Sequence, residues 1–443
     1  MQIWSSLNQQ QRTKALSRPA INNVKSLSTA VKDIIKQVKL HGDDALFTLT
    51  EQFDRVSLTS LKVNTLQIEA ATKRLSQERK EAIQLAYQQI ERFHRAQAPK
   101  DITVETLPGV VCSLKTEALE SVGLYIPAGT APLPSTVLML GVPAQIAGCE
   151  RVVLACPPDK NGQLADEVLY AARLCHINEI YNIGGAQAIA ALAIGTESIR
   201  PVRKIFGPGN RFVTEAKTQL AQSIPGFAID MPAGPSELLI IADAQAQPSF
   251  VAADLLSQAE HGSDSQVILI SDSERLILEV KEQLEQQLKL LSRQDTARQA
   301  LAQSRFIITD DLDQAVDVSN QYGPEHLSVQ TAQPKHLLKR LRNAGSIFIG
   351  PYSPESAGDY ASGTNHVLPT YGYAKVASSL SLIDFSRRYT VQELSKQGLA
   401  QLADTIIELT DAEGLDAHQR AVTIRFEDSN CFDQNDRQEK NHV

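Results

Sequence analysis

The chain has 443 residues, of which 42% are hydrophobic and 21% charged, and a formal net charge of −8. This composition is typical of a soluble globular protein of two or three domains. The negative charge argues against a nucleic-acid partner, because no excess of lysine and arginine offsets phosphate repulsion. Five cysteines occur without a Cys-x-x-Cys pair, so we expect reduced thiols and a cytoplasmic location rather than disulfides.

Neither the N-terminus nor the uncharged stretch at residues 121–149 predicts a membrane segment. The first 20 residues lack the apolar run of a signal peptide. Residues 121–149 contain Pro127, Pro132, Pro134 and Pro143, too many for a spanning helix. We therefore expect no membrane partner, and interpret the stretch as a buried strand, a turn and a helix.

Residues 1–110 follow a helical pattern. Val31, Ile34 and Val38 recur at helical spacing before Gly42, which is expected to end the helix, and a similar pattern surrounds Ile83.

Between residues 121 and 235, four short apolar runs are each followed by a glycine- or proline-containing turn and a helical stretch. The runs are 122–126, 151–155, 180–183 and 202–206; the turns are PAGT (127–130), CPP (156–158), GGAQ (184–187) and GPGN (207–210). This alternation predicts a parallel sheet with the turns at the carboxyl ends of its strands, where helix N-termini favour phosphate. No G-x-G-x-x-G motif occurs, so a dinucleotide would bind in an atypical way; alternatively, the glycines only close tight turns.

A second series of apolar runs predicts a second parallel sheet. The runs are 238–242, 266–270, 306–309, 327–330 and 346–350, with helical stretches between them. The segment from Thr390 is expected to be helical, with Thr390 and Glu393 matching a capping box. It has one apolar face and must pack on another body, its own or a partner's.

Glu325 and His326 lie between a predicted helix that ends at Tyr322 and the run at 327–330. Irregular backbone at Gly323-Pro324 would allow both side chains to face one ligand. A glutamate beside a histidine can handle protons near neutral pH. The alternative is a solvated turn, and the dipeptide alone does not decide between the two.

Four residues have the chemistry of a metal site. Gln258 and His261 share one face of a predicted helix, Asp359 lies in a predicted loop, and His418 follows the helical tail. Two imidazoles, a carboxylate and an amide oxygen suit zinc or another borderline divalent ion. Alternatively, His261 is a helix C-terminal cation and His418 a surface residue.

Longer motifs resemble those of the histidinol dehydrogenase family over residues 20–425. They are VGLYIP (122–127), FGPGN (206–210), DMPAGPSE (230–237), LSQAEHG (256–262), NQYGPEHL (320–327) and SAGDYASGTNHVLPT (356–370). One departure is Ala128-Gly129, where many members of the family have Gly-Gly.

The resemblance implies oxidation of L-histidinol to L-histidine through the aldehyde, with reduction of two NAD, as the last step of histidine biosynthesis. It implies one zinc ion per subunit, held by Gln258, His261, Asp359 and His418, the last from the partner in an intertwined homodimer. His326 would be the general base of both oxidation steps, and Glu325 would activate water.

The resemblance also implies residues that contact the other ligands. It places NAD near Tyr125, Gln187 and Asn210. Besides the metal ligands and His326, it places histidinol near Ser236, Glu413 and His366.

The expected fold is α/β, with two Rossmann-like parallel-sheet domains, a helical N-terminal segment and a helical C-terminal tail. The expected parts are an arm (1–21), a discontinuous domain with the catalytic pair and most metal ligands (22–124 plus 238–380), an inserted NAD-binding domain (125–237) and a tail that packs on the partner subunit (381–443). Three alternatives stay open: a related zinc- and NAD-dependent dehydrogenase of another amino alcohol or diol, a zinc hydrolase without cofactor, and a non-catalytic binding module.

Overall fold

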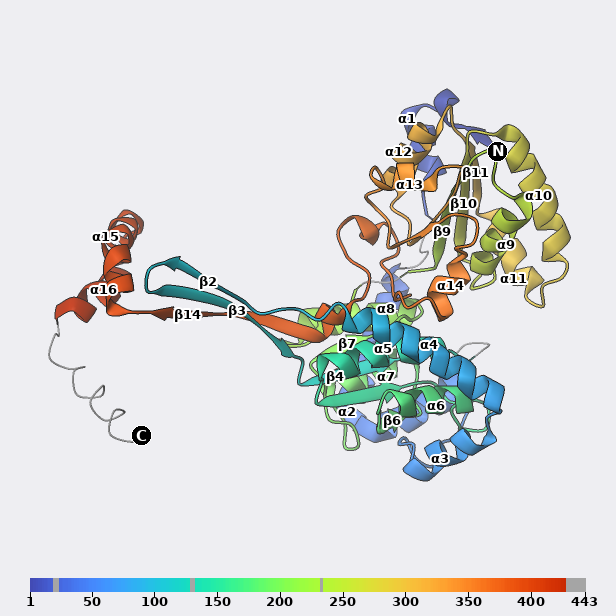
Figure 1. Cartoon of the computed structure of the whole chain (residues 1–443). Helices are drawn as coiled ribbons and strands as arrows, with labels where there is room; N and C mark the ends of the chain where they lie inside the picture. Colours follow the sequence, from blue (N-terminus) through green and yellow to red (C-terminus); the bar gives the residue numbers. More distant parts are fainter. Residues whose placement is uncertain (19–23, 128–131, 232–233, 428–443) are drawn as a thin grey trace. The chain divides into compact units, whose positions relative to one another are not determined.

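The computed structural model describes residues 1–18, 24–127, 132–231 and 234–427. The chain forms two compact units. Met1–Ala98 with Ala118–Ser386 is the first, and Pro99–Glu117 with Arg387–Val443 is the second. The first unit contains two sheets covered by helices, and the second contains a small sheet and two helices (Figure 1).

The larger sheet of the first unit has six strands in the order β1-β11-β10-β9-β12-β13, all paired in parallel. Its strands are β1 (Gln2–Ile3), β9 (Glu237–Ala242), β10 (Gln266–Ser271), β11 (Arg305–Ile308), β12 (His326–Gln330) and β13 (Ser346–Ile349). Leu238 and Ile240 pack with one set of helices, whereas Leu239 and Ile241 pack with another. The first set is α9 (Pro248–Ala259), α10 (Glu274–Leu288) and α11 (Gln294–Ala302); the second is α1 (Gln9–Ala15), α12 (Leu312–Tyr322) and α13 (Pro334–Leu338). Because both faces are covered, β9, β10 and β12 are buried throughout.

The smaller parallel sheet has five strands in the order β6-β5-β4-β7-β8. Its strands are β4 (Ser121–Tyr125), β5 (Arg151–Ala155), β6 (Glu179–Tyr181), β7 (Lys204–Phe206) and β8 (Ala228–Ile229). The helices after its strands are α5 (Pro134–Ala147), α6 (Asp166–Leu174), α7 (Gly185–Ile194) and α8 (Arg211–Ser223).

Three N-terminal helices pack against the helices of the five-stranded sheet. They are α2 (Val24–Asp54), which contacts α7 and α8, α3 (Thr65–Arg74), which contacts α6, and α4 (Gln77–Arg95), which contacts α5. These contacts group α2, α3 and α4 with the five-stranded sheet, whereas the sequence-based division grouped residues 22–124 with residues 238–380.

The second unit is built on a three-stranded sheet of order β14-β3-β2. Its elements are β2 (Ile102–Leu107), β3 (Val110–Ala118), β14 (Ser386–Leu394), α15 (Lys396–Glu413) and α16 (Asp416–Glu427). Every residue of β2 is exposed, and α15 buries only Gly398 and Thr410.

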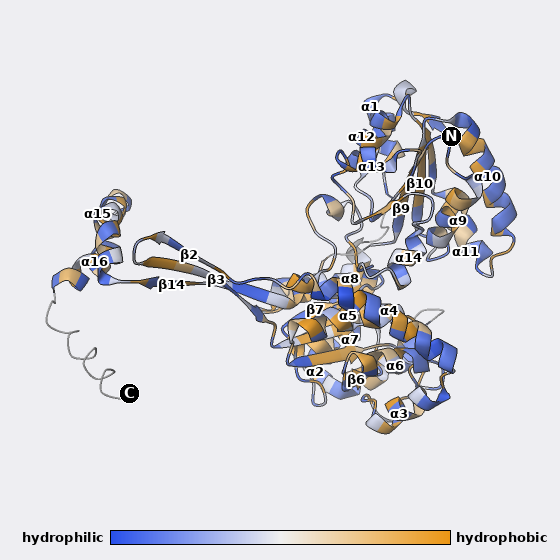
Figure 2. Cartoon of the chain, in the orientation of Figure 1, coloured by the Kyte–Doolittle hydropathy of each residue, from blue (hydrophilic) through white to orange (hydrophobic). Residues whose placement is uncertain are grey.

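The hydropathy of the residues agrees with this layered arrangement of strands and helices. Figure 2 shows apolar strands in both parallel sheets, and helices with apolar and polar faces around them. Among the helices of the described ranges, none has both the length and the apolar character that a membrane span requires.

The prediction of an α/β fold with two parallel sheets is confirmed, and each apolar run of the two series overlaps a strand. The helix expected from Thr390 is wrong at its start, because Thr390 and Glu393 lie in β14 and α15 begins after its N-cap Ser395. The helical pattern expected up to residue 110 is also wrong beyond α4, where β2 and β3 form an antiparallel hairpin. Gly42 has φ 49° and ends one helical segment inside α2. Ala128 and the turn residues at 128–130 lie outside the described residues.

Candidate active site

Glu325 and His326 lie at the amino ends of the strands of the six-stranded sheet. Helix α12 ends at Tyr322, and Gly323 follows in the left-handed region with φ 66°. The backbone oxygen of Glu325 accepts a hydrogen bond of 2.9 Å from Ser346 N at the start of β13. A Cβ atom on Gly345 would lie 2.6 Å from that oxygen, so glycine at this position allows the loop that carries Glu325 to approach β13.

The pair is buried and does not form a solvated turn, since Glu325 is 6% and His326 4% exposed. Glu325 Oε2 accepts a hydrogen bond of 2.8 Å from Glu237 N. His326 Nδ1 lies 3.1 Å from the backbone oxygen of Glu237 and 3.5 Å from Glu325 Oε2. An Nδ1 proton satisfies both oxygens, which leaves Nε2 as the basic nitrogen.

Glu355 is a third acidic residue of the site, and no sequence motif predicted it. It is 1% exposed, and neither carboxylate oxygen has a hydrogen-bond partner among the described residues. Its Oε1 lies 3.7 Å from His326 Nδ1. Glu355 and Asp359 are four residues apart on α14 (Glu355–Tyr360), so a helix in place of the expected loop puts both on one face.

The charges of this cluster are strongly coupled. Burial disfavours a charged His326, but the negative charges of Glu355 and Glu325 outweigh burial and raise the pKa of His326 well above its usual value. Burial raises the pKa of Glu355, an effect that the charge of His326 only partly offsets. Burial also favours a raised pKa for Asp359, but the attraction between Asp359 and His326 is stronger and lowers the pKa of Asp359.

Three of the four predicted metal ligands, Gln258, His261 and Asp359, belong to the first unit. Their environment fits a divalent cation. Gln258 is fully buried on α9, and neither its Oε1 nor its Nε2 has a hydrogen-bond partner within the described ranges. A buried amide without partners is costly unless a ligand satisfies it. His261 follows the end of α9 and is exposed; its Nδ1 lies 3.0 Å from Ser257 O, which leaves Nε2 to bind a metal.

Asp359 is both a predicted metal ligand and a neighbour of His326. Its Oδ1 lies 3.6 Å from His326 Nε2, beyond hydrogen-bond distance. His326, Glu355 and Asp359 offer ligand atoms that all lie within 4.8 Å of one another. An amide oxygen, an imidazole and carboxylates suit zinc or a similar ion.

Of the remaining residues predicted to contact the substrate, His366 and Ser236 belong to the first unit, and Glu413 and His418 belong to the second. His366 belongs to the cluster, since its Nδ1 lies 2.9 Å from the backbone oxygen of Asp359. Ser236 immediately precedes β9 and is half-buried, and its backbone oxygen accepts a bond of 3.1 Å from Gln266 N. His418 in α16 and Glu413 at the end of α15 are exposed residues of the second unit.

The predicted NAD residues lie at the carboxyl edge of the five-stranded sheet. The Tyr125 hydroxyl accepts a hydrogen bond of 3.0 Å from Gly185 N, and Gln187 is buried in the first turn of α7. Asn210 caps α8 by accepting bonds from the backbone N–H groups of residues 212 and 213. Gly207 has φ 118°, and a Cβ atom there would lie 2.1 Å from Tyr125 O. Two helix N-termini at glycine-containing turns fit a dinucleotide phosphate.

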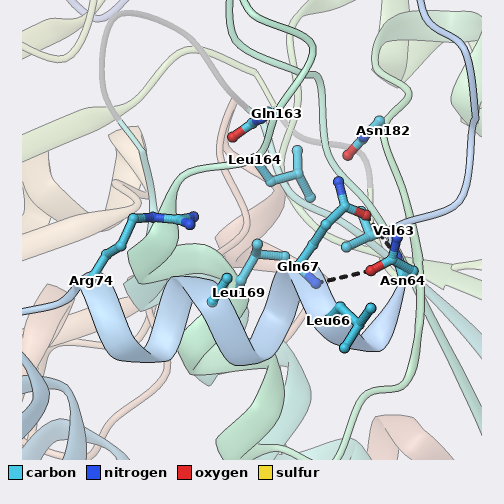
Figure 3. Close-up of a pocket in the computed structure, with 10 residues that line it drawn as sticks. Val63, Asn64, Leu66, Gln67, Arg74, Gln163, Leu164, Leu169 and Asn182 are labelled. Carbon is cyan, nitrogen blue, oxygen red and sulfur yellow. Dashed lines mark hydrogen bonds between the residues drawn. The ribbon is translucent and has the colours of Figure 1, made fainter.

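A cavity of about 230 Å³ lies elsewhere, between α3 and the segment that follows β5 (Figure 3). Asn64, Gln67 and Asn182 contribute to its wall, and Gln67 N donates a 2.9 Å bond to Asn64 Oδ1. None of the predicted site residues lines it.

Comparisons with known proteins agree with this geometry. The family model described as histidinol dehydrogenase matches residues 17–426. The histidinol dehydrogenase of Colwellia psychrerythraea is 68% identical over 96% of this chain and 98% of its own, and that of Aliivibrio fischeri is 59% identical over 96% of each chain. A crystal structure of histidinol dehydrogenase from Elizabethkingia anophelis superposes with a TM-score of 0.92 at 45% identity, covering 95% of this chain and 96% of that one. The chain therefore belongs to the histidinol dehydrogenase family, NAD-linked oxidoreductases that catalyse the last step of histidine biosynthesis.

Proposed function

We propose that the cluster around His326 oxidises L-histidinol to L-histidine with a zinc ion held by Gln258, His261, Asp359 and the partner's His418. The observation that carries the proposal is the buried amide of Gln258, which has no hydrogen-bond partner among the described residues. It lies three residues before His261 at the end of α9, in the unit where His326 adjoins Asp359. Zinc, when bound, supplies a template that holds the amine and imidazole nitrogens of the substrate and so orients its carbinol.

His326 is the general base of both oxidation steps. Its Nδ1 faces the backbone oxygen of Glu237, so Nε2 takes the proton of the substrate hydroxyl. As the O–H bond is broken at Nε2, the carbinol carbon loses a hydride and becomes the aldehyde carbon. NAD, when bound near Tyr125, Gln187 and Asn210, supplies the acceptor for that hydride.

Glu325 acts between the two oxidations. Its Oε2 is fixed by Glu237 N at 2.8 Å, and its carboxylate takes a proton from water as the water oxygen adds to the aldehyde carbon. The imidazolium of His326 gives its proton to the aldehyde oxygen, which returns His326 to its basic form. The resulting hydrate is again an alcohol, and His326 accepts its hydroxyl proton during the second hydride loss. The product is the carboxylate of L-histidine.

We also propose that segment 125–237 carries NAD and that segment 381–443 packs on a second subunit. The exposed apolar side chains of the second unit support this, since Ile102 and Val104 are each 50% exposed and Leu409 is 59% exposed. Such a surface is unusual on a monomer. In the resulting homodimer, Glu413 and His418 of one subunit would complete the site of the other.

Two measurements test this proposal. NADH formation from L-histidinol should stop when a chelator removes the metal and return when Zn²⁺ is added. A panel of other amino alcohols and diols should be oxidised much more slowly; equal rates would favour a related dehydrogenase of different specificity.

Mixed dimers test the shared site. His326→Asn and His418→Ala homodimers should both be nearly inactive. After subunit exchange, the mixed dimer should regain activity, because one of its two sites combines an intact His326 with an intact His418. Failure of mixed dimers to regain activity would show that each site is built from one chain.

A further inference from the structure

Arg18, far from the catalytic motifs in sequence, makes an extensive set of contacts beneath the catalytic pair. Its Nε and Nη2 donate to Glu237 Oε1 and Oε2 at 2.5 and 2.8 Å. Nη2 also donates to the backbone oxygens of Tyr322 and Gly323, each at 3.1 Å. The guanidinium lies 4.0 Å from the centre of the Tyr322 ring, so one side chain ties three segments together.

The backbone of the residue before Arg18 is held by a hydrogen bond to the six-stranded sheet. Ser17 O accepts a hydrogen bond of 3.2 Å from the buried amide of Gln266. The Tyr322 hydroxyl donates to the oxygen of the same amide at 2.8 Å. The arm is therefore anchored at the amino end of β10, with only 15% of the Arg18 side chain exposed.

Glu237 transmits this anchoring to both catalytic residues. Its carboxylate is 3% exposed and binds Arg18, and its Oε1 also accepts a bond of 2.9 Å from Tyr371 N. Its backbone N–H fixes Glu325 Oε2, and its backbone oxygen faces His326 Nδ1. A rotation of the Glu237 peptides would change the orientation of Glu325 and the tautomer of His326 together.

Arg18 also contacts the loop that carries the catalytic pair directly, through the backbone oxygens of Tyr322 and Gly323. The oxygens of Tyr322 and Gly323 are at the C-terminus of α12, three and two residues before Glu325. Carbonyls at a helix end need donors. Arg18 supplies them, so it holds both the loop that carries the pair and the residue that the pair contacts.

We infer that Arg18 is a positioning residue for catalysis: through Glu237 and the Gly323 turn, its guanidinium holds Glu325 and His326 in their reactive orientation. The inference depends on the catalytic roles proposed above. Lysine cannot replace arginine here, because a single ammonium lacks the planar fork that binds two carboxylate oxygens and two carbonyls at once.

Arg151 provides a matched control for a purely structural role. It donates to both carboxylate oxygens of Glu179 at 2.8 and 2.7 Å and to the backbone oxygens of residues 200 and 201. Its side chain is also 15% exposed. It lies at the start of β5, in the other sheet, and contacts no proposed site residue.

The test compares Arg18→Lys and Arg18→Ala with Arg151→Lys and Arg151→Ala. We expect Arg18→Lys to lower kcat by ~10–100-fold with KM for histidinol and NAD within about twofold of wild type, as is usual for an outer partner of a catalytic group. The pH dependence of kcat should shift, because His326 loses its fixed Nδ1 acceptor. Added guanidinium chloride below denaturing concentrations should restore part of the activity of Arg18→Ala. The Arg151 variants should lower the melting temperature and leave kcat and its pH dependence unchanged.

The possible failures are distinguishable. Wild-type kcat and pH dependence in Arg18→Lys, or equal losses in Arg151→Lys, would overturn the inference. If Arg18→Ala does not fold, Arg18→Lys decides alone, with circular dichroism to show that it is folded. His326→Asn and Glu325→Gln are assayed in parallel, and wild-type activity in those two would refute the proposed catalytic pair itself, whatever the Arg18 variants show.

Discussion

His326 Nε2 lies 3.6 Å from Asp359 Oδ1, so the proposed base and a proposed metal ligand occupy adjacent positions. A metal that binds Asp359 would neutralise this carboxylate and reduce its pull on the imidazole proton. His326 would then be more readily unprotonated near neutral pH, as a general base must be. Binding of the proposed metal and activation of the proposed base would thus be coupled through this pair.

Glu325→Gln and His326→Asn should separate the two oxidation steps. Glu325→Gln should keep much of the alcohol oxidation but block conversion of the aldehyde, because the amide cannot take a proton from water. His326→Asn should slow both steps, and each affected step should lose roughly 10²–10⁴-fold. The measurements are single-turnover NADH formation from histidinol and from histidinaldehyde. Equal loss of both steps in Glu325→Gln would contradict this division of roles.

Gln258→Ala should bind Zn²⁺ more weakly and lose activity in parallel. The loss of metal affinity should exceed the ~10–100-fold that removal of an outer partner causes. Metal content after dialysis and the shift of melting temperature with added Zn²⁺ give readouts that do not depend on activity. Gln145→Ala serves as the control, because this partly buried amide has partners, Tyr87 and His176, away from the site. An unchanged Zn²⁺ affinity in Gln258→Ala would exclude it as a ligand.

The sequence allowed most of this site to be predicted because its residues lie in long local motifs. The strands of both sheets were predictable, since strands buried on both faces are continuous apolar runs. Glu355 was missed because α14 has only six residues, between Pro354 and Ala361, too few for a helical period to be recognised. The Arg18–Glu237 pair joins residues 219 apart, and no local pattern encodes such a contact.

The hairpin of β2 and β3 was missed for another physical reason. Its strands do not alternate between a buried and an exposed face: all of β2 is exposed, and β3 is mostly half-buried. Ile102 and Val104 alternate with polar residues, but over too few positions for a period-two pattern to predict a strand. Strand β14, also largely exposed, was mistaken for a helix start for the same reason.

Glu355→Gln should reduce activity and shift its pH dependence. The carboxylate 3.7 Å from His326 Nδ1 stabilises the imidazolium that forms when Nε2 takes a proton. Its removal should lower the pKa of His326 and decrease kcat by roughly 10–100-fold, as for other outer partners. The pH dependence of kcat should move to lower pH. Glu260→Gln, a carboxylate at the end of α9, is the control, and an equal shift there would show a non-specific effect of charge.

Asp254→Asn should stabilise the protein at neutral pH but not at acidic pH. Burial raises the pKa of Asp254 to about 6, although a 2.7 Å hydrogen bond from Gln330 opposes the rise. The unfolded chain ionises near its ordinary pKa of about 4, so the folded state binds the proton more tightly. Stability from this group is fully present below pH ~4 and is lost as the pH rises through ~6.

Asparagine removes this ionisation, so the gain at pH 8 should be on the order of 2 kcal/mol and should vanish near pH 4. Chemical denaturation of the chelated enzyme at the two pH values measures it. A gain that does not depend on pH would show that the carboxylate is already ionised in the folded state.

Lys217→Met should destabilise the proposed NAD-binding turn and the whole fold. Lys217 Nζ is buried, donates to Gly207 O at 2.5 Å and binds Asp230 Oδ1 at 2.8 Å, while Asp230 Oδ2 accepts a 2.7 Å bond from Gly207 N. The pair thus holds both peptide groups of Gly207, next to Tyr125. Removing one member leaves a buried charge unpaired, which costs about 3–5 kcal/mol.

Because Gly207 lies at the proposed NAD edge and not in the cluster around His326, KM for NAD should rise while KM for histidinol stays unchanged. Urea unfolding and steady-state kinetics at a temperature where the variant is folded measure the two effects. The exposed Arg74–Asp166 pair is the control, since Arg74→Ala should cost less than about 1 kcal/mol and leave both KM values unchanged. If Lys217→Met raised KM for histidinol and NAD alike, the turn could not be assigned to NAD, and the five-stranded sheet would have to contribute to the substrate site as well.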